Sequence, residues 1–514
     1  MSDAILFNTI PSQGLVAPIF TAEFNSGGQY TSVDRIVLIG HKTATTNWPL
    51  YTPTPVSSQQ QADALAGPNS QLREMARIAM ANAPALQLWI MAVADSALTA
   101  NVTTLTLVAP AAGVGQIVIM GELIQIVVGS TDTATTVAAA LTVAIQAYYN
   151  PLTSAQLPFG ATAAAGVVTL TAHNKGAMFN EIDIHVPNNS SNVFAPSGVL
   201  TIAVTTAGAG TPTDIATALA ALGDNPADFV VCPWSDSTSL AAYAAWSNDV
   251  SGRWAWSRQT YGHVWSADVA NFAGLTTAGL ALNDRHLTLL GCISPDGQGS
   301  PHPSYLWVSA IAARLFPWLT DITYGNISRA QRGLSLIGLS PPRNPSLWPN
   351  YTARNVLNSS GISTWEVAAD GTVLISKIIT TYQQGPSGQP DAVFRDIQSV
   401  YQCAEGMKYM RAELATLFGQ KAIANSNPGS LGGLVTPADI KAGLVGIYSV
   451  LCANGVFQDA DTFAQLIKVR LNPSNPNRVD VFCPMERVNP LDILAVNATI
   501  YQQYPNVALL PQAA

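Results

Sequence analysis

The chain has 514 residues, of which 48% are hydrophobic and only 11% are charged, and 23 basic against 31 acidic residues give a formal net charge of −8. A chain of this length is expected to form roughly two to four domains. The acidic balance and the absence of any basic run argue against a nucleic-acid partner. Soluble proteins average roughly 25% charged residues, so we expect this chain to hide much of its surface against copies of itself.

Membrane insertion is not expected, because the most apolar stretches, 86–94 and 229–232, are far shorter than the roughly 20 residues of a spanning helix. Residues 1–5 lack a basic segment followed by an apolar core, so no secretory signal is expected. The scattered cysteines lack the C-x-x-C spacing of a zinc site and predict thiols in a reducing compartment. They are Cys232, Cys292, Cys403, Cys452 and Cys483.

Residues 1–32 place proline and glycine between short apolar pieces without a helical period, which predicts an extended N-terminal arm. Residues 33–95 and 211–340 alternate instead between apolar strands and helices. This alternation predicts a discontinuous α/β domain whose mostly parallel sheet is covered by helices on both faces. Strands are expected at 33–40, 86–94, 228–233, 263–266 and 286–293. Helices are expected at 57–66, 70–83, 213–222, 237–250, 267–282 and 304–316.

Residues 96–210 are almost free of charge and rich in Thr, Val, Ala and Gly, which predicts a β-rich domain inserted into the core and lying on the outside. Its expected helix is 133–149. Its expected strands are 103–108, 116–128, 166–172, 181–186 and 199–205.

Residues 341–502 are expected to form an α+β C-terminal domain, followed by an apolar tail at 503–514. Asp370-Gly371 predicts a hairpin between strands 362–366 and 372–378. A long helix is expected at 391–418, and Thr436 with Pro437 predicts the start of another. The last expected strands are 463–471, 478–483 and 491–501.

No residue pattern indicates catalysis, a cofactor or a metal. The histidines lack metal-ligand spacing, and neither a G-x-S-x-G elbow nor a P-loop occurs. Asp391, Arg395 and Asp396 could form a paired-carboxylate site or a salt-bridged helix face. The sequence therefore predicts a protein that is not an enzyme. The histidines are His41, His173, His185, His263, His286 and His302.

Short motifs are spread along nearly the whole chain. In order they are 7–11 (FNTIP), 35–40 (RIVLIG), 121–126 (GELIQI), 168–176 (VTLTAHNKG), 361–365 (GISTW), 379–382 (ITTY), 435–437 (VTP), 477–481 (NRVDV) and 489–492 (NPLD). Their order and spacing resemble those of the tail sheath proteins of Mu-type contractile-tailed phages.

This resemblance implies a structural subunit that stacks as hexameric rings around a tail tube and contracts to drive the tube through the host envelope. It implies further copies, the tube protein, and baseplate and tail terminator proteins as partners, in a virion tail assembled in the host cytoplasm. Two alternatives remain, another virion structural or adhesion protein such as a baseplate component and, last, a cytosolic α/β enzyme. Terminal arms would join neighbouring copies through Ile5, Leu6, Phe7, Ile19, Phe20, Val507, Leu509 and Leu510.

A basic helix face is the expected contact with the tube. Lys408 and Arg411 are three residues apart on the expected long helix and would share one side of it, with Lys421 just after its end. Exposed ion pairs are weak and screened by salt, which suits a grip that must be released. The alternative is an ordinary solvated face, since Glu405 and Glu413 lie nearby.

Overall fold

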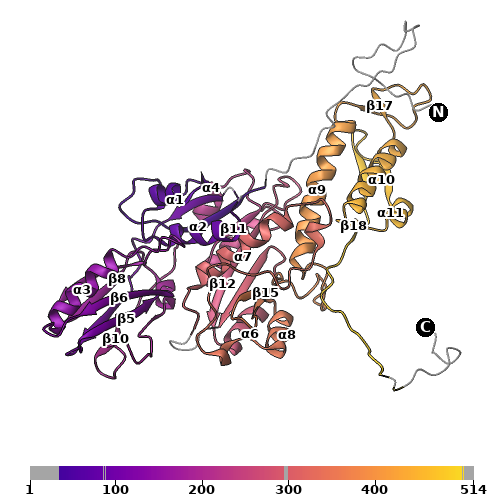
Figure 1. Ribbon diagram of the computed structural model, residues 1–514. Coiled ribbons are helices and arrows are strands. Elements are labelled where there is room, and N and C mark those ends of the chain that lie inside the picture. Colours follow the sequence, from indigo (N-terminus) through magenta and orange to yellow (C-terminus); the bar gives the residue numbers. More distant parts are fainter. Residues whose placement is uncertain (1–33, 85, 87, 294–298, 501, 503–514) are drawn as a thin grey trace, which may run out of the picture.

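The computed structural model describes residues 34–84, 86, 88–293, 299–500 and 502 (Figure 1). The expected N-terminal arm, 1–32, and the C-terminal tail, 503–514, lie outside these residues. Among the described residues, no helix combines the length and the apolar character needed to cross a membrane.

A mixed sheet of eight strands forms the core, in the order β15-β14-β13-β12-β11-β1-β3-β2. Its inner pairs are all parallel, and only the edge strands β2 and β15 run antiparallel. The expected α/β core with a mostly parallel sheet is therefore confirmed. The strands are β1 (Ile36–His41), β2 (Thr54–Val56), β3 (Leu88–Val93), β11 (Phe229–Val231), β12 (His263–Ala270), β13 (Leu287–Ile293), β14 (Ile362–Val367) and β15 (Val373–Lys377).

Helices cover both faces of this sheet. Along the sheet, β3 is added on one side of β1, whereas β11, β12 and β13 are added in turn on the other side. Because parallel crossovers are right-handed, these opposite directions place the connecting helices on opposite faces. Helix α2 packs against α7 on one face, while α6 packs against α8 on the other. The helices of the core are α1 (Gln59–Ala66), α2 (Gln71–Asn82), α4 (Ile215–Ala221), α5 (Ser237–Ser247), α6 (Phe272–Leu280), α7 (Ser304–Leu319) and α8 (Tyr351–Ser359).

Residues 102–206 form two small sheets and one helix beside the core (Figure 1). The expected strand 116–128 is wrong as a single element, because Met120 and Gly121 adopt positive φ and turn the chain into a hairpin. The sequence interpretation also missed β7. The elements are β4 (Val102–Leu107), β5 (Gly113–Ile119), β6 (Glu122–Val128), α3 (Ala134–Gln146), β7 (Phe159–Ala164), β8 (Val167–Ala172), β9 (Ile184–His185) and β10 (Leu200–Thr206).

The hairpin of β14 and β15 extends the core sheet, because β14 pairs with β13 in parallel. The expected domain boundary at residue 340 is therefore wrong for this hairpin. The boundary rested on Pro341-Pro342, and proline marks a break in local structure without showing which sheet the next strand joins.

The C-terminal region consists of helices with three two-stranded sheets, and Figure 1 places it at the opposite end of the core from residues 102–206. The Thr436 side chain caps α10 and Pro437 is its first residue, as expected. The elements are α9 (Ile397–Phe418), β16 (Ala422–Ile423), β17 (Leu434–Val435), α10 (Pro437–Ala453), β18 (Phe457–Gln458), α11 (Ala460–Leu466), β19 (Lys468–Leu471), β20 (Val479–Phe482) and β21 (Glu486–Arg487).

Three expected elements begin well after their expected first residue. The helix expected at 267–282 begins only at Phe272, because β12 continues to Ala270 and the Asn271 side chain caps α6. The long helix begins at Ile397 rather than 391. The strand expected at 463–471 is half helix, since α11 ends at Leu466.

Two helical glycines give a test of this packing. A Cβ on Gly279 of α6 would lie 2.1 Å from the Ser360 carbonyl oxygen, whereas a Cβ on Gly446 of α10 would meet open space. We expect Gly279→Ala to lower the free energy of unfolding by about 1–3 kcal/mol through overpacking. Gly446→Ala should raise it by about 0.5–1 kcal/mol, since alanine loses less backbone entropy. Urea unfolding of both variants measures these changes. If both substitutions changed the free energy of unfolding in the same direction, the packing of α6 on α8 would be contradicted.

Candidate functional site

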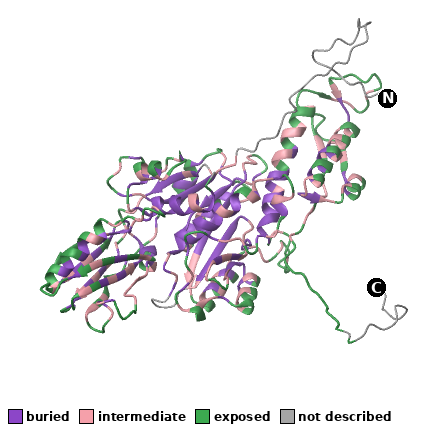
Figure 2. Ribbon diagram, viewed as in Figure 1, coloured by how far each residue is buried: buried purple, intermediate pink, exposed green. Residues whose placement is uncertain are grey.

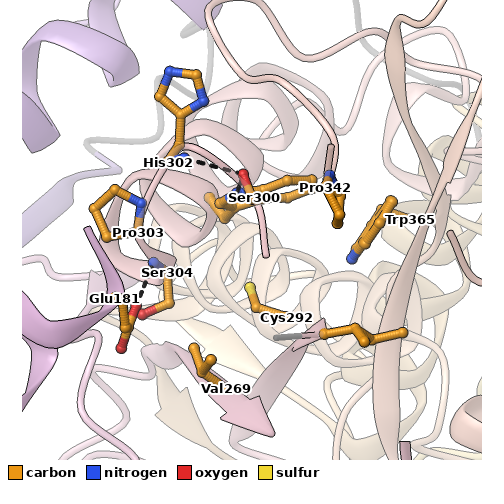
Figure 3. Close-up of a pocket in the computed structure, with 11 residues that line it drawn as sticks. Glu181, Val269, Cys292, Ser300, His302, Pro303, Ser304, Pro342 and Trp365 are labelled. Atoms are coloured by element: carbon orange, nitrogen blue, oxygen red, sulfur yellow. Dashed lines mark hydrogen bonds between the residues drawn. The ribbon is translucent and has the colours of Figure 1, made fainter. Parts of the chain in front are cut away.

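A small cavity lies where the insertion meets the core (Figure 3). Its volume is about 20 Å³, room for about one water molecule. Burial raises the pKa of the Cys292 thiol well above its usual value and lowers the pKa of His302 to about 4. A protonated thiol is a poor nucleophile, and the His302 Nδ1 accepts a hydrogen bond from the Ser340 amide at 3.1 Å. This cavity therefore holds no activated nucleophile.

The same place is a polar joint between the insertion and the core. Glu181 lies within the insertion, between β8 and β9, and its carboxylate accepts a hydrogen bond of 2.7 Å from the Ser304 amide at the N-terminus of α7 (Figure 3). The helix dipole favours a negative charge there. Asp183 pairs with Arg343 at 2.8 Å, and the Asn174 amide donates to the Lys42 carbonyl. These contacts hold the insertion to the core at several points.

Lys408 is the centre of a buried ionic cluster. Its ammonium lies 2.7 Å from Asp34, 2.5 Å from Asp228 and 2.6 Å from Glu405, and all three carboxylates are nearly inaccessible to solvent. Burial alone would lower the pKa of Lys408, but the three carboxylates raise it well above its usual value. Burial raises the pKa of Glu405 to about 8. The three carboxylate groups lie close enough together to hold a metal ion, but the Lys408 ammonium already supplies their positive charge.

The expected basic face is therefore wrong for Lys408, because its charge is turned inward and neutralised within the chain. Arg411 and Lys421 are exposed. The Arg411 guanidinium donates to the Gln259 carbonyl oxygen at 3.2 Å, and the Lys421 ammonium lies over the Phe418 ring at 5.5 Å. Their contact with a tube stays a prediction.

A second ionic cluster lies at the start of α9. Lys377 of β15 pairs with Asp396 at 2.8 Å and with Asp492 of the C-terminal segment. Burial acts to raise the pKa of Asp396, but the charges of Lys377, Arg395 and Arg487 outweigh it and lower the pKa. Asp391 is half-buried and accepts a hydrogen bond from the Tyr382 hydroxyl. Asp396 is salt-bridged, but Asp391, Arg395 and Asp396 all precede α9, so the expected helix face does not form.

Residues 488–500 leave the C-terminal region as an extended segment, drawn in green in Figure 2. The strand expected at 491–501 is wrong for the single chain, because residues 491–500 form no ladder among the described residues. All large apolar side chains of residues 491–500 are at least 72% exposed. This exposure is unusual, because burying such a side chain contributes roughly 1.5–3 kcal/mol. These side chains are Leu491, Ile493, Leu494, Val496 and Ile500.

The residues expected to join copies through the terminal arms lie outside the described residues, so their contacts stay a prediction. They are Ile5, Leu6, Phe7, Ile19, Phe20, Val507, Leu509 and Leu510. The sequence interpretation named Lys408 and Asp396 in other roles, but it did not single out Asp34 or Asp492, which take part in the two ionic clusters. Asp34 and Asp492 were detectable only as isolated acids in apolar surroundings, a signal too common to identify an ion pair.

Comparison with known proteins gives one full-length relative. The Mu-like prophage FluMu tail sheath protein of Haemophilus influenzae is 29% identical over 504 residues, which cover 96% of this chain and 98% of that protein. The expected resemblance to the tail sheath proteins of Mu-type phages is thereby confirmed. No protein-family model matches the chain.

Two solved structures are similar in outline. A sheath tail protein from Desulfitobacterium hafniense matches with a TM-score of 0.47 and 11% identity, over 92% of this chain and 97% of that one. A sheath tail protein from Listeria innocua matches with a TM-score of 0.45 and 12% identity, over 89% and 93%. Neither TM-score reaches 0.5, and the relation rests on the sequence match.

The joint at Glu181 predicts a pH dependence of stability. Burial raises the pKa of Glu181 from 4.5 to about 7, so the folded chain keeps a proton that the unfolded chain has lost. Stability should therefore fall as the pH rises from about 5 to 7. The Glu181→Gln variant keeps the acceptor for Ser304 but does not titrate. Because the residue is partly exposed, we expect wild type to lose about 1–2 kcal/mol more than the variant in urea unfolding across this range. Parallel pH profiles of the two proteins would contradict the role of Glu181.

Proposed function

We propose that this chain, a relative of the Mu-like prophage tail sheath protein, is the structural subunit of a contractile tail sheath. Copies would stack as hexameric rings around a tail tube and contract to drive the tube through the host envelope. The observation that carries this proposal is the exposed apolar segment 491–500, which has no partner strand among the described residues of its own chain.

The segment has the properties of a donated strand. Unpaired strands gain from joining a sheet edge, because their backbone N–H and C=O groups find partners there. With about six ladder bonds at roughly 1 kcal/mol each and partial burial of the apolar side chains, one joint contributes about 5–10 kcal/mol before ordering costs. A contact of this size holds neighbouring copies together when repeated at every subunit.

The pair of β19 and β20 has the properties of an acceptor. These two strands pair only with each other among the described residues, so each leaves an open edge. A two-stranded sheet is marginal alone, and Phe482 of β20 is 60% exposed. If segment 491–500 of one copy paired with β19 or β20 of another copy, the segment would gain a partner strand and the two-stranded sheet would gain a third strand.

Extended joints would let the globular bodies change their mutual orientation without separating. A lattice with two packings could then contract as a transition between states, with the energy difference stored at assembly. In this arrangement the C-terminal region faces the tube, and the insertion, at the opposite end of the core (Figure 1), lies outside. Tube, baseplate and terminator proteins would be the partners, in a virion tail assembled in the host cytoplasm, with no catalytic step.

Removal of residues 489–514 tests the donated strand. We expect the shortened chain to fold, because the core loses no ladder, and to remain monomeric where the full chain forms tubes. Negative-stain microscopy and sedimentation measure this. Leu494→Asp should weaken assembly. The comparison is Leu152→Asp in the insertion, which replaces a leucine that is still more exposed and should leave assembly unchanged.

The alternatives give different outcomes in the same experiment. Normal tubes from the shortened chain would remove the donated-strand proposal. Discrete particles from the full chain would favour a baseplate component or an adhesion protein instead of a sheath. Deletion of residues 2–31 should have the same effect as the C-terminal deletion, since a polymer joint needs both arms.

The proposed tube contact has a separate test, which leaves out Lys408 because its ammonium is paired inside the chain. Reversal of the two exposed cations, Arg411→Glu with Lys421→Glu, should leave sheath self-assembly intact and reduce assembly on the tube at low salt. Lys441→Glu on α10 is the matched control. Exposed pairs are each worth up to about 1 kcal/mol and are screened by salt, so the difference should vanish at high ionic strength. Co-assembly of the double variant at the wild-type level in low salt would reject the contact.

A further inference from the structure

The first described residue and the C-terminal segment are both fastened beside one helix, α9. Asp34, the first described residue, pairs with Lys408 of α9 at 2.7 Å. At the other end of the chain, Gln402 of α9 donates to the Val488 carbonyl at 2.8 Å. Lys377 then joins Asp492 to Asp396, the residue that precedes the first turn of α9. Residues far apart in sequence are thus fastened along one rigid element.

We infer that α9 is a strut that sets the positions of both arm exits, with Lys408 and Lys377 as the two positioning residues. From Asp396 to Lys408 the helix rises by roughly 18 Å at about 1.5 Å per residue, which fixes the spacing of the two fastenings. One consequence of the inference rests on the proposed function: in an assembled sheath, the arms of a subunit would move together with its C-terminal region. The fastening itself is a property of the single chain.

The two fastenings differ in strength. The side chains around Lys408 are 14% exposed or less, and the Arg35 amide donates to the second oxygen of Asp228 at 2.9 Å, so the N-terminal exit is held twice. The Asp492 side chain, by contrast, is 35% exposed. Salt screens an exposed pair much more than a buried one. The N-terminal exit is therefore the permanent fastening, and the C-terminal exit is the one that opens.

A groove beside Lys377 explains where the C-terminal segment is seated. It has a volume of about 240 Å³, and Asp492 and Ile493 of the segment form part of its wall. Its cations outnumber its acids, so it attracts the carboxylate of Asp492. The other charged lining residues are Arg332, Arg354, Lys377 and Arg395. The chain's own C-terminal segment therefore closes one side of this groove.

Proteolysis of the monomer under native conditions tests the C-terminal fastening. Thermolysin cuts before apolar residues in extended chain, so the rate of cutting before Leu491 and Ile493, relative to cutting before Ile500, reports how firmly the seated part is held. We expect Asp492→Asn to raise this ratio several-fold, and high salt to do the same in wild type. Mass spectrometry of the fragments gives both rates from one sample.

The controls separate a fastening from general destabilisation. Asp224→Asn breaks an exposed pair with Arg258 on the core and should leave the ratio unchanged. Lys377→Arg keeps the charge and should restore most of the wild-type ratio, whereas Lys377→Met should not. An unchanged ratio in Asp492→Asn, or an equal rise in Asp224→Asn, would overturn the inference.

The N-terminal fastening needs a variant that still folds. Lys408→Met would leave three buried carboxylates without their counter-ion and would destabilise the fold. Asp34→Asn is therefore the informative change. It removes the charge that Asp34 offers to Lys408, while Lys408 keeps Asp228 and Glu405 and the Arg35 amide keeps its hydrogen bond to Asp228. We expect Asp34→Asn to give tubes with a wider spread of subunit rotation in electron micrographs, and wild-type tubes to be uniform. Uniform Asp34→Asn tubes would overturn the strut, whereas a wild-type chain that forms no tubes would reject the proposed function and leave the proteolysis result standing.

Discussion

The contact between α9 and the central sheet is the constraint on which the rest of the structure depends. Phe229 of β11 lies between the Trp265 ring at 5.1 Å and the Tyr401 ring at 4.6 Å, and all three side chains are buried. The Trp265 indole donates to the Tyr401 hydroxyl, which donates in turn to the Asp228 carbonyl. Aromatic pairs contribute roughly 0.5–1.5 kcal/mol each beyond their buried area. This cluster makes α9 part of the core although it belongs to the C-terminal third.

Because α9 is fixed to the sheet, the features along it acquire fixed positions. The Lys408 cluster closes over Asp228, which precedes β11, and the Asp396 cluster closes over Lys377 at the end of β15. Each cluster also includes one carboxylate from a terminal segment. Asp34, the first described residue, and Asp492 of the C-terminal segment are thus both held at defined points along α9.

Buried charge has a different role at the two ends of the molecule. At α9 the lysines bridge acids on separate segments of the chain. At the insertion, Glu181 accepts from the N-terminus of α7, and a helix dipole takes the place of a counter-ion. Such groups are costly to bury, and breaking one partner costs more than the pair contributes. The arrangement therefore favours one geometry strongly over its alternatives.

The sequence by itself determined the alternating α/β core, the β-rich stretch between its halves and the cap of α10 at Thr436, because apolar period, composition and capping are local signals. It also predicted the resemblance to tail sheath proteins from the order of short motifs. Only the tertiary structure decided that β14 joins the core sheet and that Lys408 points inward to Asp34 and Asp228. Those contacts join residues up to 374 apart in the chain, and no local pattern records which distant carboxylate a lysine will meet.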